Sequence, residues 1–308
     1  MIVEAPLVSI ALCTYNGEKY IIQQLDSILA QTYKNLEIII ADDCSTDSTI
    51  EILSLYAQKD SRIKYFVNEV NLGFNKNFQK VIGLTTGAYI AISDQDDIWL
   101  PQKIEVLLAN IADKWLVFSN SDFIDENNNA LNEKIVKAFK PAGYNYKAIL
   151  LGNFVTGHTT LFKREFIHYF LPFPENGFYD WWIGFVALYH HQVVFIDEAL
   201  TQYRIHGGSV MQARILSGQE KQAEVKAIAS MLSAFVWYKH LKEEDKRFIT
   251  RLKNAYEWAM SNKRTLPLVK MIFDRYPQLF ANHKTRKGLS LLNFALKYAR
   301  KVKRYSGR

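Results

Sequence analysis

The chain has 308 residues, of which 49% are hydrophobic and 22% charged, so it is long and apolar enough to bury a large core. Its net charge is +7, but nine Lys or Arg lie within residues 284–308. The rest of the chain carries 29 basic and 31 acidic residues, a net charge of −2. A nucleic-acid-binding body, which would spread basic residues over one surface, is therefore not indicated.

The cysteines and the first residues predict where the protein works. Cys13 and Cys44 are not paired in spacing, which predicts a reducing, cytoplasmic location and neither a disulfide framework nor a zinc cluster. Met1–Cys13 has Glu4 where a signal peptide would be basic, so we expect a first strand there. No run approaches the roughly 20 apolar residues that span a bilayer.

The first half of the chain alternates short apolar runs with helical patterns. The runs predict buried parallel strands at Leu7–Thr14, Leu36–Asp42, Ile63–Val67 and Tyr89–Ser93. The helical patterns lie near Glu18–Gln31, Asp47–Lys59 and Asn75–Thr85, with Asp47 as an N-cap. This alternation predicts an α/β fold with an open, mostly parallel sheet and helices on both faces.

Polar residues follow three of these predicted strands where each strand ends. They are Thr14-Tyr15-Asn16, Asp42-Asp43 and Asp94-Gln95-Asp96-Asp97. Ligands of open parallel sheets bind at this carboxyl edge. No GxGxxG follows the first strand and no GxxxxGK[ST] occurs, so neither a dinucleotide fold nor a P-loop is indicated.

The second half of the chain is mixed and then helical. We expect strands at Leu116–Asn120, Thr159–Phe162, Val193–Ile196 and Leu200–Arg204, and a helix near Tyr179–Tyr189. After Ser217 the pattern is helical, with breaks near Lys239–Glu243, Asn262–Pro267 and Ala281–Gly288. A boundary near residues 211–218 then separates an α/β body, residues 1–212, from a C-terminal helical extension, residues 213–308.

The acidic turn after the fourth strand has three carboxylates within four residues, on Asp94, Asp96 and Asp97. A divalent cation would hold them ionised together, and hard oxygen ligands suit Mg²⁺ or Mn²⁺. Such an ion also neutralises charge on a leaving nucleoside diphosphate. The alternative is a solvated turn in which Asp97 caps the next helix. The position at the end of a buried strand favours the metal site.

Four segments together resemble the successive motifs of the inverting family 2 glycosyltransferases, which have the GT-A fold. They are Val8–Asn16 (VSIALCTYN), Ile38–Asp47 (IIIADDCSTD), Asn71-Leu72-Gly73 and Ser93–Pro101 (SDQDDIWLP). The run Asp94–Trp99 (DQDDIW) is particularly similar to the branch with many bacterial rhamnosyltransferases. The resemblance covers roughly residues 5–210. It implies a catalytic domain with a nucleotide-sugar half, about 1–115, and an acceptor half, about 116–212.

The resemblance also implies roles for individual residues. Asp94 and Asp96 match the metal-binding DxD. Asp43 would accept the imide N–H of uracil or thymine, which cytosine lacks. Lys76 stands where many relatives have Arg and lacks Arg's fork geometry. The implied nucleotide-binding set is Thr14, Asn16, Asp43, Asn71, Lys76, Asn77 and Asp94.

Sugar transfer to a hydroxyl also needs a base that removes the acceptor's proton. Asp180 lies among aromatic residues in Phe178–Trp182 (FYDWW), at the start of a predicted helix. Burial there would raise its pKa, whereas the helix N-terminus would lower it. Local sequence leaves a simple N-cap equally open. An acid followed by Trp at this distance after the DxD resembles the family's catalytic base, which favours the catalytic role.

Two further segments resemble family motifs. In Tyr203–His206 (YRIH) the family's His contacts the metal or the diphosphate, so His206 is a candidate metal ligand, and Gly207-Gly208 would let a ligand approach the backbone. Gly157–Thr160 (GHTT) resembles the segment that lines the donor-sugar and acceptor pocket. The expected pocket residues are Gly157, His158, Thr159 and Trp182, although Trp182 could equally pack in the core.

The basic tail follows helical spacing. Asn293, Lys297, Arg300, Arg304 and Arg308 form one polar, mostly cationic stripe, with apolar residues away from it. Such a helix would contact anionic lipid head groups, each cation adding about 1 kcal/mol near that surface. The alternative, equally open, is that its apolar face packs on the body while the charges stay solvated.

The sequence therefore predicts a metal-dependent enzyme, with Mg²⁺ or Mn²⁺, that transfers a sugar from a dTDP- or UDP-sugar to a glycan or lipid-linked glycan. Rhamnose is one candidate sugar. One alternative is a sugar-nucleotide pyrophosphorylase, but the Gly-rich, Arg-containing loop expected after its first strand is replaced by Thr14–Gly17. Another is a glycan-binding protein without turnover, which would be expected to lose the DxD or the base. We expect a cytoplasmic protein, peripheral on the inner face of the plasma membrane if residues 284–308 bind lipid.

Overall fold

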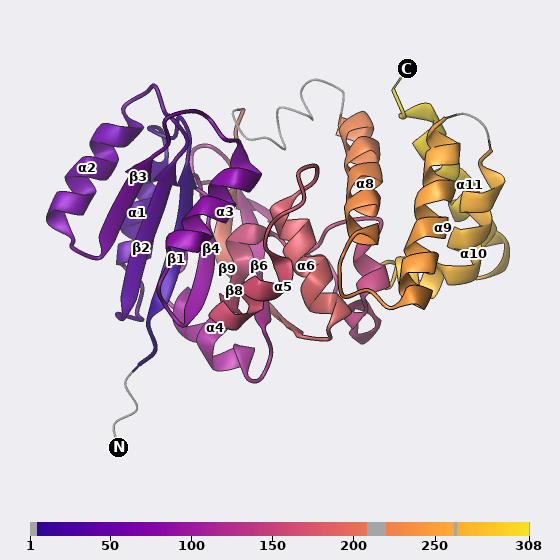
Figure 1. Ribbon diagram of the computed structural model, residues 1–308, viewed down its shortest axis with the longest axis horizontal. Helices are drawn as coiled ribbons and strands as arrows, with labels where there is room; N and C mark the ends of the chain where they lie inside the picture. The colour runs from indigo at the N-terminus through magenta and orange to yellow at the C-terminus, as the bar shows by residue number, and fades with distance from the viewer. Residues whose placement is uncertain (1–4, 208–219, 262–263, 308) are drawn as a thin grey trace. The chain divides into compact units, whose positions relative to one another are not determined.

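The structure is a computed structural model that describes residues 5–207, 220–261 and 264–307 (Figure 1). The chain forms two compact units, which are described separately. The first unit contains Met1–Lys137, Val155–Phe173 and Gln192–Ile205. The second contains Ala138–Phe154, Pro174–His191 and His206–Arg308. The predicted boundary near residues 211–218 lies outside the described residues, so the division at residue 212 stays a prediction.

The first unit begins with the parallel strands expected from the sequence. They are β1 (Val8–Thr14), β2 (Leu36–Asp42), β3 (Ile63–Val67) and β4 (Tyr89–Ser93), in the spatial order β3-β2-β1-β4. Apolar β-branched residues make β1 and β2 almost continuously buried, as expected for strands covered on both faces. In register, Thr14 lies opposite Asp42 and Leu12 opposite Ser93. Their carboxyl ends therefore meet at one edge.

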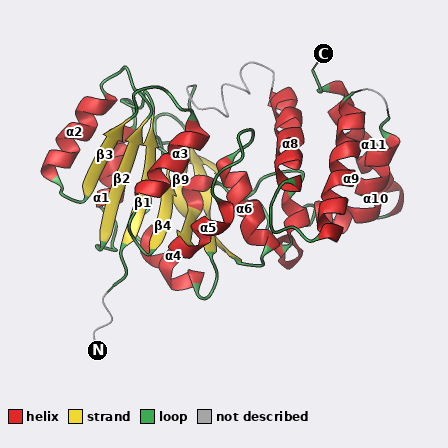
Figure 2. Ribbon diagram, in the orientation of Figure 1, coloured by secondary structure: helices red, strands yellow, loops and turns green. Residues whose placement is uncertain are grey.

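Helices cover the two faces of this sheet. They are α1 (Ile21–Leu29), α2 (Thr49–Lys59), α3 (Phe74–Leu84) and α4 (Lys103–Ile111). Ile10, Ile38, Leu25 and Leu107 belong to one core cluster, which joins β1 and β2 to α1, α2 and α4. The helix α3 packs on β1 and β2 with a different set of apolar residues. Figure 2 shows this alternation of strands and helices.

The start of α2 differs from the expected N-cap. The capping position is Ser48, whose side chain makes no capping hydrogen bond. The Asp47 carboxylate still accepts the Thr49 N–H at 3.1 Å and also accepts the Glu18 N–H at 3.0 Å. Asp47 therefore satisfies one free donor of the helix and also ties α2 to the loop after β1.

The sheet continues with strands of mixed direction. They are β8 (Thr160–Lys163), β6 (Leu116–Ile124), β9 (Val193–Arg204) and β5 (Ile98–Trp99), with β7 (Ala130–Lys134) paired to β6. The two strands predicted at Val193–Ile196 and Leu200–Arg204 are one strand, because β9 keeps pairing with β6 across a bulge near Asn120. β6 likewise runs beyond the predicted Asn120. The short elements η3 (Gly157–Thr159), η4 (Arg164–Phe166) and α5 (Ile167–Phe170) flank β8.

The second unit is helical where it is described. It contains η1 (Pro141–Tyr144), η2 (Tyr146–Ile149), α6 (Tyr179–Tyr189), α8 (Glu220–Val236), α9 (Glu243–Met260), α10 (Leu266–Leu279) and α11 (Gly288–Arg304). Breaks between the last four helices follow the predicted breaks, although residues 262–263 lie outside the described residues. The α/β class with a C-terminal helical extension is thus confirmed.

Two sequence-based expectations concern covalent links and membrane crossing. Cys13 and Cys44 are free thiols. Among the helices in the described part of the chain, none combines the length and hydropathy that crossing a bilayer requires.

Candidate functional site

The carboxyl edge of the parallel strands brings several predicted polar residues together. Thr14 ends β1 and is buried, and its hydroxyl donates to Asp42 Oδ2 at 2.7 Å. Asp42 also accepts from the backbone N–H and the hydroxyl of Ser45. Asp42 thus holds the loop after β2, and Thr14 presents little of its side chain to solvent.

Asp43, which was expected to recognise the nucleobase, accepts hydrogen bonds from neighbouring parts of the chain. Its carboxylate accepts from Asn68 Nδ2 and Leu72 N, both at 2.7 Å, and from Gly73 N at 2.9 Å. Asn77 is also buried, donating to the Ala41 carbonyl while its side-chain oxygen accepts from Asn68. These bonds shape residues 68–73, so any base contact by Asp43 would use its remaining lone pair.

Three further predicted nucleotide-binding residues, Asn16, Asn71 and Lys76, are exposed. The Asn16 side-chain oxygen accepts from Thr46 N at 2.8 Å, which joins the loop after β1 to the loop after β2. The Asn71 side-chain oxygen accepts from Gly73 N at 3.1 Å. Lys76 lies in the first turn of α3 with its side chain in solvent. These groups border the edge and remain accessible to a ligand.

The acidic turn is fixed by Arg204, the last residue of β9. Its Nε donates to the Asp96 carbonyl at 2.8 Å, and its backbone N–H donates to Asp97 Oδ1 at 3.1 Å. Asp94 and Asp96 are half-buried, whereas Asp97 is 0% exposed and its Oδ2 has no hydrogen-bond partner. Burial, with the neighbouring Asp96 and Asp94 charges, raises the pKa of Asp97.

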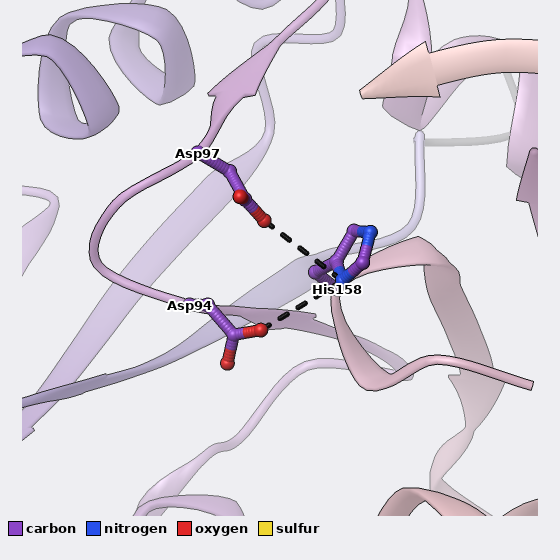
Figure 3. A group of neighbouring side chains, drawn as sticks. All are labelled: Asp94, Asp97 and His158. Carbon is purple, nitrogen blue, oxygen red and sulfur yellow. Dashed lines mark ion pairs between the residues drawn. The ribbon is translucent and has the colours of Figure 1, made fainter. Parts of the chain in front are cut away.

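His158, in η3, faces the acidic turn (Figure 3). Its Nδ1 lies 3.7 Å from Asp94 Oδ2 and 3.9 Å from Asp97 Oδ2, and these three atoms converge closely enough to share a cation. Its Nε2 is 2.9 Å from the Ser121 hydroxyl, and its ring stacks on Tyr203. His158 is 2% exposed, and burial lowers its pKa, so the ring is neutral at physiological pH.

The positive charge of Lys103 would repel a cation bound between His158 and the acidic turn. It is buried, and its ammonium group donates to the His158 carbonyl and to the Thr201 hydroxyl while lying over the Trp99 ring. Burial lowers the pKa of Lys103, although Asp97 and Asp94 oppose that shift. The carboxylate oxygens suit Mg²⁺ or Mn²⁺, and the buried Asp97 Oδ2, which has no hydrogen-bond partner, would be available to such an ion.

Two expected metal ligands lie outside this convergent group. Asp96 belongs to the same turn, half-buried beside Asp94. His206 follows β9 directly, is half-buried, and belongs to the second compact unit. Gly207 is exposed, and Gly208 lies outside the described residues. Their roles as ligands therefore stay predictions.

The predicted base, Asp180, lies in the first turn of α6 in the second unit and is half-buried. Its Oδ1 accepts from Trp181 N at 2.7 Å, and its Oδ2 accepts from Asn153 Nδ2 at 3.0 Å. The N-cap position belongs to Phe178, so Asp180 is not the N-cap residue. An amide donor holds the carboxylate in one orientation, which suits a base.

The expected pocket residues are mainly buried. Gly157 and Thr159 lie in η3 next to His158, and the Thr159 hydroxyl donates to the Thr156 carbonyl. The Trp182 ring stacks parallel to Phe235 and lies edge-on to Tyr238. This packing favours the core role that the sequence left open for Trp182.

Sequence reasoning missed several residues of the site. Arg204 lies within the YRIH segment but was not singled out. Gln95, between the two DxD carboxylates, bonds to the loop after β1. Lys103 lies in an ordinary amphipathic helix, so no local signal distinguishes it from a surface lysine.

Comparison with known sequences identifies the family. The model of glycosyl transferase family 2 matches residues 9–170. An uncharacterised glycosyltransferase of Methanocaldococcus jannaschii is 37% identical over 214 residues, which is 66% of this chain and 72% of the relative. An Escherichia coli protein, the UDP-Glc:alpha-D-GlcNAc-diphosphoundecaprenol beta-1,3-glucosyltransferase WfaP, is 31% identical over 66% of this chain and 79% of its own length.

Comparison with solved structures supports the fold. Staphylococcus aureus TarS, solved in complex with UDP-GlcNAc, aligns with a TM-score of 0.61 at 20% identity, covering 98% of this chain and 90% of that one. A mannosyltransferase of Pyrobaculum calidifontis, solved with GDP-Man and Mn²⁺, aligns with a TM-score of 0.58 at 15% identity, covering 99% and 85%. The fold is of the GT-A type. With an acidic turn at the carboxyl edge of its sheet and the family match spanning more than half its length, the chain belongs to glycosyl transferase family 2 and is a glycosyltransferase.

Proposed function

We propose that the protein transfers a sugar, with inversion at the anomeric carbon, from a UDP- or dTDP-sugar to a glycan or lipid-linked glycan acceptor in cell-surface polysaccharide synthesis. The observation that carries this proposal is the carboxyl edge of the sheet. There the Asp94–Asp96 turn lies beside the loops after β1 and β2, which expose Asn16 and hold Asp43. The site for a metal-bound diphosphate would thus lie next to the site for a nucleoside.

Asp94 and Asp96 would hold the divalent ion, with His206 as a further ligand. Both carboxylates are half-exposed and can face a nucleotide, whereas Asp97 and His158 are buried beside the Lys103 ammonium group. When bound, the ion would neutralise the negative charge that develops on the leaving nucleoside diphosphate. The second possible set, Asp94 with Asp97 and His158, has the convergent geometry in its favour.

The two ligand sets can be separated by Mn²⁺ binding to single variants. Asp96→Asn should weaken binding at least tenfold if the exposed set holds the ion, since an ionised oxygen ligand is lost. Asp97→Asn should then have the smaller effect. The reverse order would assign the ion to Asp97 and His158. Asp113→Asn, an exposed change on the same unit, is the matched control.

Asp180 would act as the general base that takes the proton from the acceptor hydroxyl. Asn153 orients its carboxylate. Asp180→Asn should lower the transfer rate by roughly 10²- to 10⁴-fold. Asp274→Asn, an exposed change in the same unit, should leave the rate unchanged. Full activity of Asp180→Asn would refute the assignment.

The proposed donor and acceptor are supported by the name of a relative and by a sequence resemblance. UDP-Glc and a diphosphoundecaprenol-linked acceptor appear in the name of the E. coli relative, which supports UDP-sugars and lipid-linked glycans. Rhamnose is supported only by the resemblance around Asp94–Trp99. A panel of UDP- and dTDP-sugars, tested with Mg²⁺ or Mn²⁺, should reveal the donor as the nucleotide sugar that most raises Tm, because ligands of the folded state stabilise it. EDTA should abolish the effect.

Contact with a membrane surface through residues 284–308 is part of the proposal. Leu291, Ala295, Ala299 and Val302 are the buried side of α11, which packs on α9 and α10. Lys297, Arg300 and Arg304 are exposed, while Arg308 lies outside the described residues. The apolar face of α11 therefore packs on two helices of the same unit. Leu289 and Leu292, 85% and 39% exposed, would insert beside the cations.

Sedimentation with phosphatidylcholine vesicles, with and without phosphatidylglycerol, tests this contact. Wild-type protein should sediment with the anionic vesicles and be released by salt. Lys297→Glu/Arg300→Glu should remain in solution. Lys246→Glu/Arg247→Glu, the same charge change on the exposed side of α9, is the matched control. Equal binding by both double variants would refute a role for α11.

A further inference from the structure

Gln95 links the acidic turn to the loop that follows β1. Its Oε1 accepts the Tyr15 backbone N–H at 2.8 Å, and its Nε2 donates to the Tyr15 carbonyl at 3.1 Å. The side-chain amide thus pairs with both polar groups of one backbone residue, much as a neighbouring strand would. Because Gln95 stands between Asp94 and Asp96, this pairing fixes the position of the turn relative to Tyr15.

Gly17 leaves room for this link. A Cβ at Gly17 would lie 2.4 Å from Gln95 Oε1, so a larger residue would displace the amide. Gly17 is itself held by Thr49, whose hydroxyl accepts its N–H at 2.8 Å, and its carbonyl accepts from Tyr20 and Ile21 at the start of α1. The loop is therefore anchored to two helices independently of Gln95.

The link extends to the loop after β2. Asn16 N donates to Ser45 Oγ, and Asn16 Oδ1 accepts from Thr46 N, so Tyr15 is followed by a residue bound to the loop that begins with Asp43. On its far side the acidic turn is held by Arg204 through the Asp96 carbonyl. Gln95 thus bonds the turn to the nucleotide-side loops through its side chain.

We propose that Gln95 is a positioning residue that sets the spacing between the metal turn and the nucleotide-binding loops, so that binding of the metal and of the nucleotide reinforce each other. This inference rests on the proposed function, in which one diphosphate contacts both sides. A ligand that bridges two sites binds well only when their spacing is preset, and a misplacement of about 1 Å costs about a hundredfold in rate. Gln95 touches neither reacting group.

The test measures the affinity of UDP, and of dTDP in parallel, by calorimetry with and without Mn²⁺. In the wild-type protein Mn²⁺ should tighten binding by a factor in the usual range of about 5 to 150. Gln95→Met, which keeps the shape but loses both hydrogen bonds, should reduce that factor to near one. Binding of UDP without Mn²⁺, and the urea midpoint, should change little. A merely structural role would move those two quantities instead.

A second variant, at Gly17, tests the same hydrogen bonds between Gln95 and Tyr15. Gly17→Ala should displace the Gln95 amide and reduce the same factor, and Gly17→Ala/Gln95→Met should be no worse than the more impaired single variant. Gly83→Ala, where an added Cβ meets nothing within 4 Å, and Gln58→Ala, on the exposed side of α2, are the controls.

The outcomes separate the two proposals. Undiminished Mn²⁺ enhancement in Gln95→Met would overturn the role of Gln95 and leave the proposed function standing. A wild-type protein whose UDP and dTDP affinities ignore Mn²⁺ would overturn the shared diphosphate site, and the role of Gln95 with it. Additive losses in the double variant would also contradict the inference, because they would show that Gly17 acts through something other than the amide.

Discussion

Two buried carboxylates at opposite edges of the parallel sheet, Glu37 and Asp97, have pKa values shifted in opposite directions. At the amino edge, Glu37 of β2 accepts hydrogen bonds from the Ser9 hydroxyl, from Thr86 through its N–H and hydroxyl, and from Gly87 N. Burial alone would raise the pKa of Glu37, but these donors outweigh it and hold the pKa below its usual value. The fully hydrogen-bonded Glu37 carboxylate therefore stabilises the amino edge of the sheet.

At the carboxyl edge Asp42 and Asp43 are also paired with hydrogen-bond donors, but the acidic turn contains a buried carboxylate that is not fully paired. Asp94, Asp96 and Asp97 lie within four residues, Asp97 Oδ2 has no hydrogen-bond partner, and the pKa of Asp97 is raised. Such an arrangement lowers stability unless a cation completes it. The difference between the edges indicates that the amino edge serves the stability of the sheet and that the carboxyl edge is shaped for a charged ligand.

The largest expected effect is on catalysis at the carboxyl edge. Asp94→Asn should lower the rate of sugar transfer by roughly 10³-fold, because stabilisation of the leaving group by a metal is worth several kcal/mol. Its midpoint in urea should stay within experimental error of the wild type or rise. If Asp94→Asn lost both stability and activity, the conclusion that the acidic turn serves the ligand and not the stability of the fold would be wrong.

The next effect is on stability at the amino edge. Glu37→Gln should lower the free energy of unfolding by about 1–3 kcal/mol, because buried donors lose a charged acceptor. Transfer activity of the folded protein should be unchanged. Urea unfolding against Glu69→Gln, an exposed control, measures the change. Equal stabilities of the two variants would show that Glu37 is not the stabilising group.

The pH dependence sharpens the same contrast. Because the pKa of Glu37 is depressed in the folded state, its contribution is complete above the pKa of the unfolded chain and is lost as pH falls through the folded-state pKa. The stability difference between wild type and Glu37→Gln should therefore be constant from neutral pH down to the pKa of the unfolded chain and should shrink as the pH falls below it. A difference that persists at the lowest pH would contradict the charged-acceptor explanation.

The smallest effect is expected at the exposed rim of the carboxyl edge. Lys76→Ala should raise the KM for the nucleotide sugar by no more than about fivefold, since an exposed ion pair contributes at most about 1 kcal/mol. Lys76→Arg should leave the KM equal to that of the wild type or lower it, because a guanidinium can donate two parallel hydrogen bonds to a phosphate. Steady-state kinetics with the preferred donor measures both. A hundredfold loss would show that Lys76 is buried against the diphosphate when the donor binds.

Sequence pattern predicted the nucleotide-side half of the fold closely. Three of its four strands have the predicted bounds, because their apolar residues alternate with strong helical patterns and turn signals. The mixed half was predicted less well. β9 was divided at Asp197–Ala199, where polar residues interrupt the apolar pattern, yet pairing with β6 carries the strand across the bulge. Non-local hydrogen bonding overrode the local pattern there.

The residues of the site divide in the same way. Asp94, Asp96 and Asp43 could be found because they follow buried strands and resemble family motifs. Lys103 and Arg204 could not, because their importance comes from burial and from partners as distant as Gln23 and His158. Membership of a glycosyltransferase family also favours the leading hypothesis over a pyrophosphorylase or an inactive glycan-binding protein.

The sequence by itself determined the α/β class, the polar groups at the carboxyl edge and the family, since these depend on short motifs and on periodicity along the chain. Only the tertiary structure decided which groups meet. It brought His158 to Asp94 and Asp97, and it paired Gln95 with Tyr15. The physical reason is that sheet register and burial, which no local pattern encodes, set the distances between residues far apart in sequence.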